Sequence, residues 1–224
     1  MRPWKTIERV ETSEGPLELR QRGERDFLIT IDGRILMTSV AHRSEDALAR
    51  LGCGAARGLE RPRVLLGGLG MGYTLRAALD LLPASAEVTV VDLNAAVVAW
   101  CRGPLSALTA RAIEDPRVRV EVADVARVIA GARAGWYDAI LLDLYEGPHQ
   151  ATNAATDPLY GALALNRAWT ALRAGGRFAV WSEEADRAFE HRFAAAGFKV
   201  ETHRAGGGRT HVVYVGTRTR EPNT

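Results

Sequence analysis

Long apolar runs are missing from this sequence. No stretch of the 224 residues approaches the roughly 20 consecutive apolar residues that a membrane-spanning helix needs. Residues 1–20 mix polar and apolar side chains and lack the basic start and continuous apolar segment of a secretory signal. We therefore expect a cytoplasmic protein that has no membrane partner.

Cysteine and lysine are also scarce. The 2 cysteines, Cys53 and Cys101, lie far apart, and no histidine stands at metal-ligand spacing around them. This argues against a disulfide framework and against a zinc site, so no metal is expected. Lys5 and Lys199 are the only lysines among 29 basic residues, which disfavours Schiff-base chemistry.

The charge shows no excess of one sign. The formal net charge is +2 and the arginines are scattered, so the chain has no nucleic-acid footprint, and nucleic acid stays open only as a substrate. The hydrophobic fraction of 47% and the charged fraction of 25% are those of an ordinary globular protein. The length suits one main domain with a small appended element.

The first forty residues predict short β-segments at 6–10, 17–21, 27–31 and 34–37. Asp32 and Gly33 between two apolar runs are typical of a hairpin turn. Residues 44–51 have helical spacing, and 52–62 resembles a linker. We expect an N-terminal β-segment with a short helix at 1–58, a cofactor-binding catalytic domain at 59–217, and a flexible tail at 218–224.

From residue 63 onward, short apolar runs alternate with helical stretches. Strands are predicted at 64–67, 88–92, 118–122, 138–143 and 178–182, and helices at 73–82, 95–102, 125–132, 160–172 and 186–196. A closing antiparallel hairpin is predicted at 199–203 and 211–216, with its turn at 206–208. The pattern predicts a Rossmann-like, doubly wound, mostly parallel α/β sheet, with ligands at the carboxyl ends of the strands.

A Gly-Gly-Leu-Gly-Met-Gly run at 67–72 lies between the first of these strands and its helix. Glycines let the backbone turn tightly and approach a ligand, and free N–H groups at a helix start favour an anionic group. Gly68, Gly70 and Gly72 are therefore candidate cofactor-binding residues. The alternative is that the glycines serve only the turn from strand to helix.

Two carboxylates follow the next two strands. Asp92 ends its strand about twenty residues beyond the glycine loop, where such an acid accepts hydrogen bonds from ribose hydroxyls. Asp124 follows the third strand, at a position suited to an adenine amino group. Asp124 is equally well explained as the cap of the helix that begins at residue 125, and the two roles can coexist.

Reaction chemistry is predicted at the end of the fourth strand. Asp143 and Glu146, three positions apart on one loop, can attract an amine, orient it and accept its proton; Asp143 also borders the cofactor. The alternative is that Asp143 caps a loop and Glu146 is solvated. His149 is a further candidate general base. Tyr145 and Trp181 are candidate substrate-binding residues.

With this order of glycine loop, Asp92, Asp124 and Asp143 behind a β-rich N-terminal segment, residues 17–200 resemble the spermidine synthase (polyamine aminopropyltransferase) family and its methyltransferase-like relatives. The resemblance implies a class I methyltransferase fold, S-adenosylmethionine or its decarboxylated form as cofactor, a small-molecule acceptor and a homodimer.

The chain also departs from the family pattern. Gly70 stands where the family has an aspartate that binds the aminopropyl amine of the decarboxylated cofactor. Without that acid, the loop is better suited to the methionine carboxylate of S-adenosylmethionine. Glu146 keeps the second acid of the family's Asp-Ser-Ser-Asp-Pro loop. Residues 43–45, Arg-Ser-Glu, replace the family's Tyr-His-Glu, so the tyrosine contact with the acceptor is lost.

These observations favour a S-adenosylmethionine-dependent methyltransferase that acts on a small nucleophilic acceptor. The alternatives are aminopropyl transfer from decarboxylated S-adenosylmethionine to a polyamine, and a non-catalytic protein that binds the cofactor or a partner. A dinucleotide-dependent dehydrogenase is disfavoured by the glycine spacing.

Overall fold

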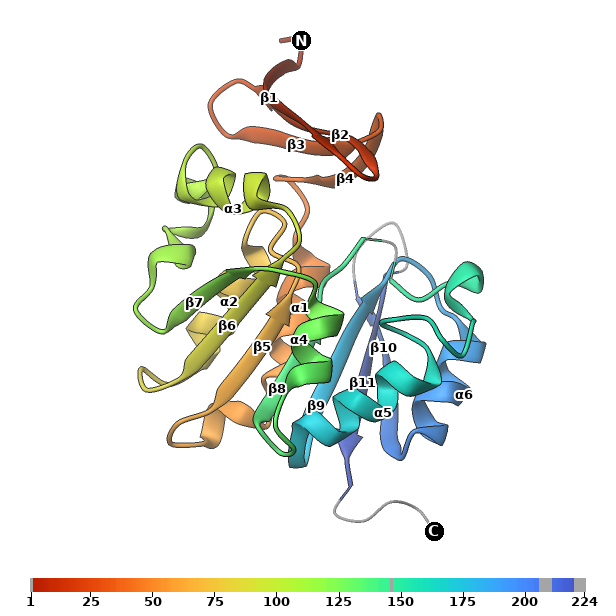
Figure 1. Ribbon diagram of the computed structural model, residues 1–224. Coiled ribbons are helices and arrows are strands. Elements are labelled where there is room, and N and C mark those ends of the chain that lie inside the picture. Colours follow the sequence, from red (N-terminus) through yellow and green to blue (C-terminus); the bar gives the residue numbers. More distant parts are fainter. Residues whose placement is uncertain (1, 146, 206–210, 220–224) are drawn as a thin grey trace.

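The computed structural model describes residues 2–145, 147–205 and 211–219 (Figure 1). The N-terminal segment forms a four-stranded antiparallel sheet in the order β1 (Lys5–Thr12), β2 (Gly15–Arg22), β3 (Asp26–Ile31) and β4 (Arg34–Thr38). All four predicted β-segments are confirmed. The turn between β3 and β4 holds Asp32 at φ 46° and Gly33 at φ 75°, which is the backbone that an Asp-Gly hairpin predicts.

The larger sheet has seven strands in the order β10-β11-β9-β8-β5-β6-β7. The strands are β5 (Arg63–Gly67), β6 (Glu87–Asp92), β7 (Val118–Val122), β8 (Tyr137–Leu142), β9 (Leu172–Ser182), β10 (Phe198–Ala205) and β11 (His211–Arg218). The first five pair in parallel, and β11 pairs antiparallel with both β9 and β10. The doubly wound sheet and its closing hairpin are confirmed, while the turn predicted at 206–208 lies outside the described residues.

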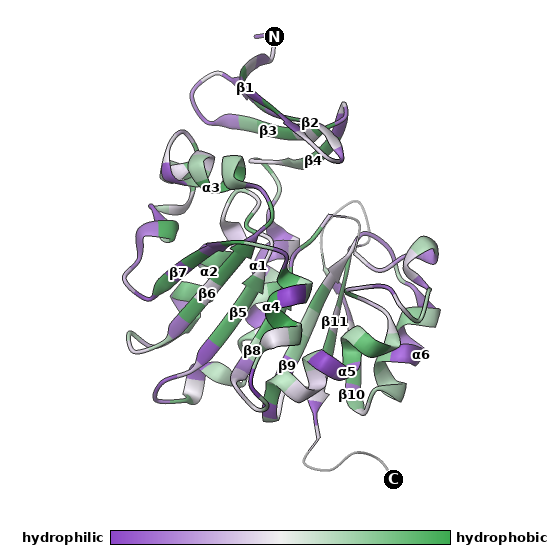
Figure 2. Ribbon diagram, viewed as in Figure 1, coloured by the Kyte–Doolittle hydropathy of each residue, from purple (hydrophilic) through white to green (hydrophobic). Residues whose placement is uncertain are grey.

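Helices cover both faces of this sheet because its strands are apolar on both sides. On β5, Val64 and Leu66 join one buried cluster and Leu65 joins the other, as the two-residue period of a strand requires. The first cluster holds α1 (Arg43–Gly52), α2 (Tyr73–Leu81) and α3 (Ala95–Arg102). The second holds α4 (Val125–Gly131), α5 (Ala162–Ala171) and α6 (Arg187–Ala195), and the apolar strands are visible in Figure 2.

Some predicted boundaries were wrong. Helix α5 begins at Ala162 rather than at residue 160, because the Asp157 carboxylate accepts the backbone N–H groups of Leu159 and Tyr160 and holds a turn there. The helix ends at Ala171, and β9 begins at once. The predicted linker at 52–62 contains a 3₁₀ turn, η1 (Ala56–Gly58). Further 3₁₀ turns are η2 (Ser106–Thr109), η3 (Ala112–Glu114) and η4 (Gln150–Thr152).

The small sheet lies over the carboxyl ends of the parallel strands (Figure 1). Its inner apolar side chains belong to the same buried cluster as α1, α2 and α3; among them are Leu17, Leu19, Phe27, Ile29 and Ile31. The buried Trp100 indole of α3 donates a hydrogen bond of 2.8 Å to the Glu8 carboxylate of β1. In the described ranges, no helix has both the length and the apolar character needed to cross a bilayer.

Candidate active site

A cavity of about 680 Å³ opens between the small sheet and the carboxyl ends of the parallel strands. Its walls come from the loops after β5, β6, β7 and β8 and from strands β2, β3 and β4. Eight of the predicted site residues line it: Gly68, Gly70, Asp92, Asp124, Asp143, Tyr145, His149 and Trp181. The structure therefore brings them together. Gly72 is not among the lining residues, and Glu146 lies outside the described residues.

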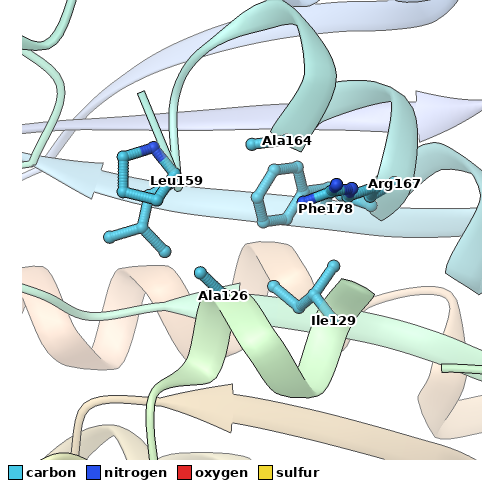
Figure 3. A pocket seen from close by; sticks show the side chains of 8 residues that line it. Ala126, Ile129, Leu159, Ala164, Arg167 and Phe178 are labelled. Atoms are coloured by element: carbon cyan, nitrogen blue, oxygen red, sulfur yellow. The ribbon is translucent and has the colours of Figure 1, made fainter. Parts of the chain in front are cut away.

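A second pocket of about 10 Å³ lies between α4 and α5 (Figure 3). Apolar side chains such as Ile129 and Phe178 surround it, and the volume suits about one water molecule at most. The large cavity, at the switch between β5 and β8 where the chain leaves one side of the sheet for the other, is the place where such folds bind ligands.

The glycine loop lies directly against the end of β8. Gly68 has φ 87°, and a Cβ atom at this position would overlap the backbone carbonyl oxygen of Asp143. Its N–H donates to the Val91 carbonyl at 2.8 Å. A glycine is required here because any side chain would push the loop away from Asp143.

We expected the N–H groups of this loop to be free for an anion, but four of them already have acceptors in the protein: Gly68, Leu69, Met71 and Gly72. Two of these acceptors are side chains. Asp92 accepts the Leu69 N–H at 2.8 Å, and the Met37 sulfur accepts the Met71 N–H at 3.1 Å. These hydrogen bonds thus fix the loop to β6 and to the small sheet.

Met37 also fills the space beside Gly70. A Cβ atom at residue 70 would lie 2.7 Å from the Met37 sulfur, and the backbone there has φ 51°. The loss of the acid expected at this position is therefore accompanied by a thioether from β4 in the adjoining space. The sequence alone carried no sign of this contact, because the two residues are far apart along the chain.

Asp92 is 9% exposed and holds its carboxylate rigidly. One oxygen accepts the Leu69 N–H and the other accepts the Asn94 N–H, each at 2.8 Å. Burial raises the pKa of Asp92, and these two hydrogen bonds act in the opposite direction. Each carboxylate oxygen has a second lone pair, so the group is still able to accept a hydrogen bond from a ligand hydroxyl.

Asp124 is the N-cap of α4, where its carboxylate accepts the Ala126 N–H at 2.8 Å. The capping role considered from the sequence is confirmed. The same residue lines the cavity, so the structure leaves its predicted contact with an adenine ring open.

Asp143 is the most perturbed acid of the cavity. Its carboxylate accepts a hydrogen bond of 2.5 Å from the Thr74 hydroxyl of α2. Burial and, after it, the nearby charge of Glu45 raise the pKa of Asp143 to about 7, and the Thr74 hydrogen bond acts in the opposite direction. A carboxyl group that titrates near neutral pH is suited to accepting a proton.

Glu45 is the acidic neighbour that sequence reasoning missed. It lies in the first turn of α1, is 9% exposed and lines the same cavity as Asp143. Its carboxylate accepts a hydrogen bond of 2.6 Å from the Ser44 hydroxyl. Two carboxyl groups from distant parts of the chain therefore line one cavity, close enough for the charge of Glu45 to act on Asp143.

The remaining predicted residues have structural contacts as well. The His149 Nδ1 atom accepts the Ala151 N–H at 3.2 Å and caps η4. Tyr145 is 42% exposed, and the Arg34 guanidinium lies 5.5 Å from its ring centre. Trp181 packs edge to face against His211 with ring centres 5.1 Å apart. The roles predicted for these residues stay predictions.

Fold and site together define a Rossmann-like domain of the class I methyltransferase type whose cavity lies under an N-terminal sheet. No protein-family model matches the chain. The spermidine synthase of Thermotoga maritima superposes with a TM-score of 0.74 over 97% of this chain and 74% of that chain, at 16% identity. A probable spermidine synthase from Corynebacterium glutamicum gives 0.66 over 96% and 81%, at 17% identity. The predicted resemblance is confirmed at the level of the fold.

The chain is also similar in sequence to putrescine N-methyltransferases. Putrescine N-methyltransferase 4 from Nicotiana tabacum and putrescine N-methyltransferase 1 from Nicotiana attenuata are each 33% identical to this chain over 114 residues. The match spans 51% of this chain and 28% of each of those relatives.

Proposed function

We propose that this chain is a S-adenosylmethionine-dependent methyltransferase that acts on a small amine. The observation that carries the proposal is that Asp143 and Glu45 line one cavity, where the charge of Glu45 acts on Asp143, and that the glycine loop of this cavity has no acid at residue 70. The named relatives are consistent with it, since matched sequences are putrescine N-methyltransferases and matched structures include spermidine synthases.

The residues of the cavity fit a sulfonium nucleoside. A volume of about 680 Å³ lies within the usual range for small-ligand pockets of about 300–1,000 Å³. Asp92 would accept hydrogen bonds from the ribose, and Asp124 would contact the adenine amino group. Apolar side chains along the same wall, such as Val91 and Leu93, would pack against the base.

When bound, S-adenosylmethionine would supply an electrophilic methyl carbon: the amine nitrogen forms a bond to it while the carbon–sulfur bond breaks and its electron pair goes to sulfur. An alkylamine is an ammonium ion at neutral pH and has no free lone pair until it loses a proton. Asp143 accepts that proton, and the two carboxyl groups attract the cation and orient it. Such a general base contributes about 10² to 10⁴-fold in rate.

Aminopropyl transfer is the second candidate. One matched structure is a spermidine synthase in complex with the transition-state analogue AdoDATO, which has a TM-score of 0.74 to this chain. Against it stands the thioether of Met37 beside Gly70, in the place where an acid would be needed to hold an aminopropyl ammonium group.

Calorimetry tests the cofactor, and turnover tests the acceptor. We expect S-adenosylmethionine to bind more tightly than its decarboxylated form, and methyl transfer to be detected with diamines such as putrescine. Asp143→Asn should keep cofactor affinity within about threefold while turnover falls by about 10² to 10⁴-fold.

Three outcomes contradict the proposal. Tighter binding of the decarboxylated cofactor, together with aminopropyl transfer, would favour the second candidate. Binding of S-adenosylmethionine without turnover on any amine would favour a non-catalytic binding protein. An Asp143→Asn variant with full turnover would remove the general base from the scheme.

A further inference from the structure

We propose that Ser44 and His211 are positioning residues that hold the Glu45 carboxylate within the cavity near Asp143 and thereby influence whether Asp143 carries a proton. The catalytic consequence depends on the proposed function, while the effect on Asp143 is testable in the free protein. Neither Ser44 nor His211 was singled out as a site residue from the sequence.

The three residues form a hydrogen-bonded chain from β11 through α1. The His211 Nδ1 atom lies 3.1 Å from the Ser44 hydroxyl oxygen, and that hydroxyl donates to Glu45 at 2.6 Å. A serine hydroxyl has one hydrogen to donate, and Ser44 gives it to Glu45. The Ser44 oxygen must therefore accept from His211, which places a hydrogen on Nδ1 of the imidazole.

The hydrogen-bonded side chains of Ser44 and Glu45 are buried where they approach the cavity. Ser44 is 5% exposed and Glu45 is 9% exposed, so water competes little for either group. The His211 ring packs edge to face on Trp181, which itself lines the cavity. The contact with Trp181 thus fixes the orientation of the His211 ring. The imidazole in turn fixes the position of the Glu45 carboxylate through its hydrogen bond with Ser44.

Charged and titratable groups face Asp143 from more than one element. Glu45 comes from α1 and Tyr160 from the turn before α5, where Asp157 lines the same cavity; Thr74 of α2 is a neutral donor. Burial and then the charge of Glu45 raise the pKa of Asp143, while burial and then the charges of Asp157 and Asp143 raise the pKa of Tyr160. Glu45 is therefore the neighbour whose position controls Asp143 most directly.

Other groups face Glu45 itself. Tyr73 of α2 is one: burial raises the pKa of this phenol, and the charges of Glu45 and then Asp46 act in the same direction. The groups that hold the Glu45 carboxylate in place are Ser44 and, through it, His211. Removing either donor lets the Glu45 carboxylate move, which weakens the effect of its negative charge on Asp143.

The direction of the expected shift follows from this. A carboxylate beside another carboxylate has a raised pKa because a second negative charge is unfavourable. If Glu45 loses its charge or its position, the pKa of Asp143 falls from about 7 toward its ordinary value. Under the proposed function, the acid limb of the kcat/KM profile then moves to lower pH and the maximal rate falls, because Asp143 becomes a weaker base.

Carboxyl ¹³C NMR titration of the free protein measures the first effect without any cofactor or acceptor. The Asp143 resonance is assigned by its loss in Asp143→Asn. We expect Glu45→Gln to lower the pKa of Asp143 by about 1 unit or more, and Ser44→Ala and His211→Gln to lower it by about 0.5 unit or more. Ser44→Thr keeps the hydroxyl and should titrate like the wild type.

A matched control distinguishes the loss of the His211–Ser44 hydrogen bond from a general effect of losing a histidine. His203→Gln removes an imidazole on the neighbouring strand β10, where it lies 3.5 Å from the Glu201 carboxylate, and should leave Asp143 unchanged. Wild-type titration of Asp143 in both Ser44→Ala and His211→Gln would overturn the proposal. If instead the pKa of Asp143 shifts as expected but no amine is methylated, the positioning role of Ser44 and His211 is supported and the proposed function is contradicted.

Discussion

The contact between Met37 and Gly70 predicts a coupling that a double-mutant cycle would measure. In Gly70→Ala, the new methyl group meets the Met37 sulfur at 2.7 Å, and alanine must adopt a backbone with φ 51°. We expect the cost to be substantially smaller when Met37 is also replaced by alanine, because one of the two penalties then disappears.

The magnitude follows from the two penalties. A left-handed backbone costs a non-glycine residue about 1–2 kcal/mol, and overpacking adds about 1–3 kcal/mol. Gly70→Ala should therefore lower the free energy of unfolding by about 2–5 kcal/mol. In the Met37→Ala background only the backbone term remains, so the coupling energy should be about 1–3 kcal/mol.

Thermal and urea unfolding of the four proteins in the cycle measure this coupling. For a chain of this size, 1 kcal/mol corresponds to about 2–4 °C in Tm, so the relief is well within detection. Because methionine is flexible, its sulfur is also free to move aside, and the lower end of the range describes that case.

Gly68→Ala is the matched control. Its methyl group would overlap the backbone carbonyl of Asp143, which cannot rotate away, so Met37→Ala should give no relief there. If Gly70→Ala and Met37→Ala are additive within about 0.5 kcal/mol, the thioether does not fill the space beside residue 70 and our explanation of the glycine is refuted.

Two further predictions concern the cap of α4 and the thiols. Asp124→Ala should lower the free energy of unfolding by about 1 kcal/mol, and Asp124→Ser should restore most of it; cofactor affinity that stays low in the serine variant would separate a ligand contact from the cap. Burial raises the pKa of Cys53 and of Cys101 to about 12, so an aromatic disulfide reagent at pH 8 should label neither thiol until the protein unfolds, and rapid labelling of the folded protein would contradict this.

Local patterns in the chain were enough to predict the architecture. The side chains at 64–66 belong to both buried clusters. A strand that is buried on both faces has a continuous apolar sequence, and this run is continuous. The glycine loop and Asp92 follow strands directly, and the common direction of parallel strands brings their carboxyl ends to one edge. The same reasoning placed Asp124 and Asp143 at that edge.

Contacts between distant segments were not predictable in this way. Met37 of the small sheet contacts the glycine loop, and the charge of Glu45 on α1 acts on Asp143. Ser44 and His211 are 167 positions apart, yet they share a hydrogen bond. The start of α5 was also misjudged, because a side-chain turn at Asp157 competes with helix formation.

The difference has one physical cause. Each strand or helix must bury one face or two, so the apolar residues recur with its period. This pattern lies within a short stretch of sequence and is therefore detectable without the fold. Which side chain fills the space beside Gly70, or which acid raises the pKa of Asp143, depends on how the small sheet and α1 pack over the parallel strands. That packing is a property of the whole fold and is decided only when every segment is in place.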